Sequence, residues 1–142
     1  MTARLLTPSK ITAWLSCEHA LTLQHQLESG AIAPVAQPFG SFARLLANKG
    51  LEHEAACLAA YRAQGLSVVD LRPQRERKVP EDELVAATLE AMRGGEQVIV
   101  QAALHHENWF GYADVLRRVA GESALGAWHY EAHDTKLARE TR

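Results

Sequence analysis

The chain changes its hydrophobic period about two-thirds of the way along, and this change most constrains its fold. Residues 7–95 carry apolar side chains mainly at the three- and four-residue spacing of amphipathic helices. From residue 96 onward the pattern alternates instead, in three runs that are separated by short polar connections. This order predicts an α+β chain, with N-terminal helices followed by a three-stranded antiparallel meander.

The first helical segment, residues 7–30, has clear start and break signals. Thr7 can act as the N-cap, and Pro8 takes the first helical position, where a missing N–H costs nothing. The apolar stripe is interrupted at Glu18, which predicts a break near Cys17.

Glycine and proline delimit the remaining elements, and Gly50 is expected to interrupt the second helical segment. The expected elements are helices over residues 39–65 and 81–95, a short strand over 66–71, a loop over 72–80, and strands over 96–104, 108–119 and 125–138.

Composition and charge exclude several functional classes. The 142 residues favour a single domain, 1–142, and a net charge of -2 argues against a chain that coats nucleic acid. Cys17 and Cys57 form no CxxC, which excludes a zinc ribbon and a thioredoxin-like motif and favours a reducing compartment. The chain has no signal-peptide pattern and no run long enough to span a bilayer, so we expect a cytoplasmic protein.

Two of the expected strands set an aspartate among apolar or aromatic neighbours. Asp114 shares a strand face with Phe110 and Tyr112, and Asp134 shares one with Trp128 and Tyr130. A carboxylate on such a face costs free energy unless it is paired or binds a cation.

If the two faces coincide, Asp114 and Asp134 converge with Lys136 beside them. Two carboxylates form a hard oxygen site suited to magnesium or manganese. The alternative for Asp134 and Lys136 is an ordinary surface ion pair.

The opposite face of the last strand carries a rival group of ligands. His129, Glu131 and His133 could bind zinc or iron, or could form a plain solvated face. A zinc protease is not expected, because Cys57 stands where the second histidine of HExxH would be.

Four motifs resemble those of one nuclease family in order and spacing. "GYAD" followed by "DTK" is similar to the core of the PD-(D/E)xK nucleases, and "KGLEHEAACL" resembles the histidine-bearing helix of their RecB-like branch. The opening "LTPSKITAWLSCEHALTL" resembles the start of RecB-like and CRISPR-associated adaptation exonucleases. The resemblance implies a restriction-endonuclease-like fold and exonuclease-like, metal-dependent hydrolysis of DNA.

The resemblance also implies roles for individual residues. His53, Asp114 and Asp134 would bind Mg²⁺ or Mn²⁺, with help from the Thr135 carbonyl. Lys136 would orient the attacking water or stabilise the phosphate in the transition state.

The chain departs from the family pattern in two respects. It reaches Arg142 before the helix and strand that follow the DxK strand in the family, so we expect a truncated core. Cys17 matches the first of four iron–sulfur cysteines, but the other three would have to be supplied from outside this sequence.

These departures leave the partners and the activity open. A downstream nuclease domain, a helicase or a second copy of the chain could cover the sheet edge left open. The alternative function is a DNA- or protein-binding fragment without catalysis. Four basic residues of the expected loop could follow a phosphate backbone or form a solvated charge run: Arg72, Arg75, Arg77 and Lys78.

Overall fold

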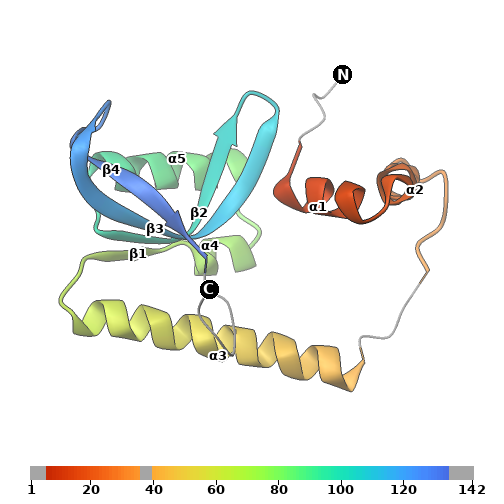
Figure 1. Cartoon of the computed structure of the whole chain (residues 1–142), viewed down its shortest axis with the longest axis horizontal. Coiled ribbons are helices and arrows are strands. Elements are labelled where there is room, and N and C mark those ends of the chain that lie inside the picture. Colours follow the sequence, from red (N-terminus) through yellow and green to blue (C-terminus); the bar gives the residue numbers. More distant parts are fainter. Residues whose placement is uncertain (1–5, 36–39, 135–142) are drawn as a thin grey trace. The chain divides into compact units, whose positions relative to one another are not determined.

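The computed structural model describes residues 6–35 and 40–134, which form two compact units (Figure 1). The N-terminal unit contains residues 6–35 and the hairpin segment 105–111, and the larger unit contains residues 41–104 and 112–134. No helix within the described ranges is long and apolar enough to cross a membrane.

The N-terminal unit is built on helices α1 (Pro8–Ser16) and α2 (Glu18–Glu28). The backbone N–H of Lys10 donates to the Thr7 hydroxyl oxygen at 3.3 Å, which confirms the predicted N-cap. Cys17 has an extended backbone, with φ -165° and ψ 113°, so the predicted break between the helices is also confirmed.

The larger unit begins with the 23-residue helix α3 (Ser41–Ala63), which runs through Gly50 without a break. The predicted junction at Gly50 was therefore wrong. A single glycine costs a helix only about 1 kcal/mol relative to alanine, which a long helix can absorb. The helix ends just before Gly65, whose φ of 75° is the left-handed conformation expected beyond a helix C-terminus.

A four-stranded mixed sheet forms the centre of this unit. Its strands lie in chain order: β1 (Val68–Asp70), β2 (Val98–His106), β3 (Trp109–Ser123) and β4 (Gly126–His133). β3 and β4 are antiparallel, whereas β1 is parallel to β2.

The α+β class is confirmed, but the prediction of a purely antiparallel, three-stranded sheet was wrong. β1 joins the sheet through a crossover that contains α4 (Arg72–Glu76) and α5 (Glu81–Arg93). A strand of three residues has no period long enough to show which neighbour it pairs with, so the sequence could not reveal this parallel pairing.

Helices α3 and α5 cover opposite faces of the sheet (Figure 1). Leu58 of α3 packs with Val98 and Val100 of β2, while Ala91 of α5 packs with Ile99 of the same strand. Alternate residues of β2 therefore point to different helices, and both faces are buried, as expected for a strand next to a parallel neighbour.

The segment predicted as a basic loop contains a short helix, α4 (Arg72–Glu76), which corrects that prediction. The Asp70 carboxylate accepts the backbone N–H of Arg72 at 3.1 Å and so stabilises the start of this helix. Pro73 lies in the first turn of α4, where proline is favoured.

Candidate active site

The register between β3 and β4 brings the two predicted aspartate positions together. Val115 pairs with His133 and Leu116 with Ala132, so the predicted strand faces coincide. Continuing this register by one pair places Asp114 opposite Asp134, just beyond the end of β4. Directly opposed residues have Cβ atoms about 4.5–5.5 Å apart, which is close enough for two carboxylates to share one cation.

A chain of hydrogen bonds from Arg75 through Gln101 holds the Asp114 carboxylate. The Gln101 amide nitrogen Nε2 donates to Oδ1 of Asp114 at 3.2 Å. The Gln101 oxygen Oε1 in turn accepts a hydrogen bond from the Arg75 guanidinium, which lies 4.1 Å from the centre of the Tyr112 ring. Asp114 is thereby oriented by an amide that is itself fixed by an arginine.

A local departure from extended backbone gives Gln101 this position. Its φ is 54°, a left-handed conformation that is uncommon for a residue other than glycine. Two residues later the Ala103 N–H donates to the hydroxyl of Thr88 on α5, at 3.0 Å. Thr88 is fully buried, so this hydroxyl replaces a strand partner where water cannot.

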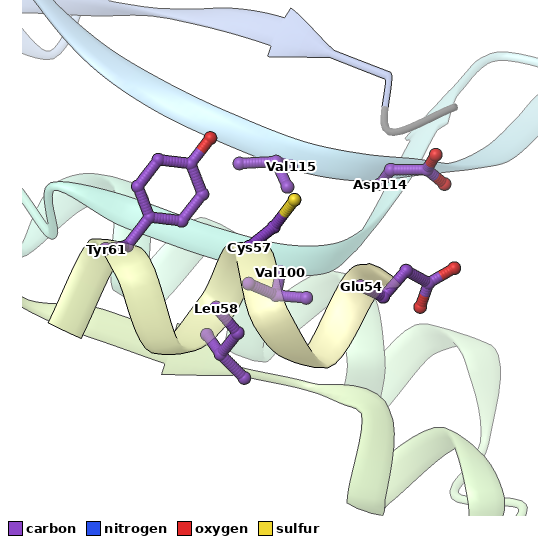
Figure 2. Close-up of a pocket in the computed structure, with 7 residues that line it drawn as sticks. All are labelled: Glu54, Cys57, Leu58, Tyr61, Val100, Asp114 and Val115. Carbon is purple, nitrogen blue, oxygen red and sulfur yellow. The ribbon is translucent and has the colours of Figure 1, made fainter. Parts of the chain in front are cut away.

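Asp114 also lines a small cleft between β3 and α3 (Figure 2). Glu54 of α3 also lines this cleft, and in Figure 2 the carboxylates of Glu54 and Asp114 both point away from Cys57 and Val100. Cys57 and Tyr61 form the more apolar part of the wall. The enclosed space, about 10 Å³, is that of about one water molecule or a small ion.

Glu54 was missed in the reading of the sequence, although a signal for it exists. It lies four residues before Leu58, the buried residue of α3, and therefore on the sheet-facing side of the helix. Helical periodicity would have selected Glu54 rather than its neighbour His53, which had been chosen from the family motif.

His53, which the family resemblance implies as a metal ligand, lies beside Cys57. Its Nε2 lies 3.7 Å from the Cys57 sulfur, and it is not among the residues that line the cleft. Within residues 6–35 and 40–134, no three His, Cys, Asp or Glu side chains are grouped closely enough to hold a metal. Asp134 is exposed, and Thr135 and Lys136 lie outside the described residues.

The rival ligands on β4 lie side by side but remain open to solvent. The Nε2 atoms of His129 and His133 are 3.9 and 3.8 Å from the Glu131 carboxylate, and all three side chains are between 41 and 57% exposed. They do not form a metal-binding group in the described part of the chain, and the geometry matches the solvated face considered as the alternative.

The four basic residues of the expected loop have separate local contacts. Arg72 makes two side-chain hydrogen bonds to Asp70, at 2.9 and 2.7 Å, and these bonds hold the pKa of Asp70 below its usual value. The same pair raises the pKa of Arg72. Arg77 donates to the Pro73 carbonyl, and Lys78 has a left-handed backbone after α4.

Cys17 lies exposed between α1 and α2. Its exposure does not fit a small buried hydrophobe, which is the usual role of a lone helix cysteine. Its role as an iron–sulfur ligand depends on cysteines outside this sequence and stays a prediction.

Comparison of the chain with protein-family models, with curated proteins and with solved structures finds no match.

Proposed function

We propose that this chain carries the core of a divalent-metal-dependent nuclease that hydrolyses DNA phosphodiester bonds in the cytoplasm. The proposal places it in the RecB-like branch of the PD-(D/E)xK superfamily, with a restriction-endonuclease-like fold. The observation that carries it is the β3–β4 register, which starts at the pair Val115 and His133 and, continued by one pair, would set the aspartates of "GYAD" and "DTK" opposite each other. Glu54 lines the same small cleft as Asp114, from α3, the helix that bears the third family motif.

The donor set fits magnesium or manganese. Asp114 and Glu54 are hard oxygen donors on a cleft of about ion size, and Asp134 lies next in register. A bound ion would lower the pKa of a water molecule and neutralise charge that develops on the phosphate. In this arrangement His53 would affect the bound ion only through the residues beside it.

The surrounding residues have distinct tasks in this proposal. Gln101 orients the Asp114 carboxylate, and Arg75 fixes Gln101, so both are positioning residues. Lys136 follows Asp134 by two residues, the strand spacing that keeps two side chains on one face. Its proposed task is to orient the attacking water.

The test is cleavage of labelled single- and double-stranded DNA with Mn²⁺, and with Mn²⁺ plus excess chelator. Cleavage should depend on the metal and should fall by at least roughly 100-fold in Asp114→Asn, Asp134→Asn and Lys136→Ala. Glu54→Gln should fall comparably, because it removes a proposed ligand. Asp82→Asn is the matched control, since Asp82 is an exposed acid at the start of α5.

Metal binding measured by calorimetry separates catalysis from mere binding. Mn²⁺ should bind to the wild type and to Asp82→Asn, and more weakly to Asp114→Asn. Metal and DNA binding without any cleavage would instead favour the non-catalytic alternative. Full cleavage by both aspartate variants would remove the proposed site.

A further inference from the structure

A second pocket of the larger unit lies near the starts of β1 and β2, and its charge is opposite to that of the cleft. Its volume is about 330 Å³, within the range of small-molecule pockets. Arg117 and Arg118 of β3, Trp128 of β4 and Gln97 line it, and none of the described lining residues is acidic. A concave cationic surface of this kind is suited to an anion.

Arg117 has an unmet hydrogen-bonding need. Its Nη1 atom is buried and has no hydrogen-bond partner among the described residues, although the guanidinium lies 5.0 Å from the Tyr61 ring centre. Glu131 pairs with Arg117 in the strand register, but its oxygens lie near His129 and His133 instead. A desolvated guanidinium N–H without an acceptor is costly, but this atom has almost no solvent-exposed area, so Arg117 acts on the pocket through its charge.

Arg118 and Trp128 form a fixed polar and aromatic wall. Arg118 donates to the Gly95 carbonyl and lies 5.9 Å from the Trp128 ring centre, while the indole N–H donates to the Met92 carbonyl at 3.2 Å. A Cβ on Gly95 would meet both side chains, at 3.1 and 3.4 Å, so the backbone approaches them closely. The indole is therefore held in place before any ligand arrives.

Tyr130 extends this anchoring on the same strand. Its hydroxyl donates to the Glu96 carbonyl at 2.6 Å, and burial raises the pKa of Tyr130. The strand that carries Trp128 is thereby tied to the end of α5 at two points.

We propose that this pocket binds one nucleotide, with its phosphate on Arg118, near the charge of Arg117, and its base against Trp128. Arginine presents a planar fork of donors that matches phosphate, and nucleobases stack on aromatic and guanidinium planes. Three to four residues of β3 separate these arginines from Asp114, about 10–13 Å at roughly 3.3 Å per residue. The inference does not depend on cleavage, because binding at this pocket requires no metal.

The experiment measures binding of a short fluorescent DNA single strand by anisotropy, with EDTA present throughout. Arg118→Gln and Arg117→Gln should each weaken binding and should reduce the slope of log K against log salt by about 0.7. Trp128→Leu should weaken binding about 5- to 150-fold with the slope unchanged. Arg44→Gln, which removes the same charge from an exposed site on α3, should have little effect.

Competition with thymidine 5′-monophosphate identifies the source of the nucleotide. Displacement of the strand by the free nucleotide means that the pocket accepts a single unit, and no displacement means that it needs the linked strand. The proposal is overturned if Arg118→Gln, which is exposed and keeps its fold by circular dichroism, binds as tightly as Arg44→Gln. Loss of cleavage with this binding intact would count against the proposed nuclease alone.

Discussion

Replacing Thr88 with valine tests whether the α5 hydroxyl supports the backbone beside Gln101. Thr88 is 0% exposed, and its Oγ1 accepts the Ala103 N–H while donating to the Leu84 carbonyl. Valine has nearly the same shape, so the Thr88→Val variant opens no cavity. It leaves the Ala103 N–H buried without a partner.

The magnitude follows from that one unmet donor. A buried N–H without an acceptor costs about 1–3 kcal/mol, so the free energy of unfolding should fall by about 2 kcal/mol in Thr88→Val. Thr88→Ser keeps the hydroxyl and loses one buried methyl group, which costs about 1 kcal/mol. Thr88→Val, although it has the larger side chain, should therefore be less stable than Thr88→Ser.

Urea unfolding of the two variants and the wild type measures this difference. The midpoint should fall in the order wild type, Thr88→Ser, Thr88→Val, with unchanged m-values. Hydrogen exchange at the Ala103 amide should also become faster in Thr88→Val, and not in Thr88→Ser. A Thr88→Val protein as stable as Thr88→Ser would show that the hydroxyl is not needed at this strand.

Two further perturbations test contacts elsewhere in the sheet. Asp70 has a lowered pKa in the folded state because of Arg72, so its stabilisation is present above about pH 4 and is lost as the pH falls through that lowered value. Asp70→Asn should thus lower the free energy of unfolding at neutral pH by about 1.5–3 kcal/mol. A plot of the urea midpoint against pH should also become flatter at acid pH in this variant. An unchanged plot would contradict the role of Asp70. Gly121 has φ 155°, and a Cβ there would lie 2.7 Å from the His129 ring, so Gly121→Ala should cost about 1–3 kcal/mol. His129→Ala should restore part of that loss in a double-mutant cycle, and full additivity would argue against the contact.

The helices that carried local end signals could be predicted from the sequence. Thr7 and the break at Cys17 were correct because capping and interrupted periodicity depend only on neighbouring residues. The junction expected at Gly50 is absent because a long helix absorbs the low helix propensity of a single glycine. The parallel partner of β1 is a contact over 30 residues, and no local pattern encodes it.

The candidate site could also be predicted only in part from the sequence. Strand alternation predicted that Asp114 and Asp134 would share a face, and the β3–β4 register agrees with that prediction. The positions of Gln101 and Arg75 could not be predicted, because they depend on a left-handed residue inside a strand and on a helix read as a loop. Helical periodicity indicates Glu54 on the sheet-facing side of α3, whereas the family motif indicates His53, whose role stays a prediction.

One strand, β3, carries both the acidic cleft and the basic pocket, and this constrains how a nucleic acid could use them. The carboxylates of Asp114 and Glu54 repel phosphate unless a cation lies between them, and the chain as a whole has a net charge of -2. Attraction must therefore come from local positive charge, which Arg117 and Arg118 provide a few residues along the same strand. If both proposals hold, removing the metal should abolish cleavage while the strand stays bound, and removing Arg118 should weaken binding while Mn²⁺ affinity stays unchanged. A parallel loss of both properties in either experiment would mean that the two places on β3 form a single site.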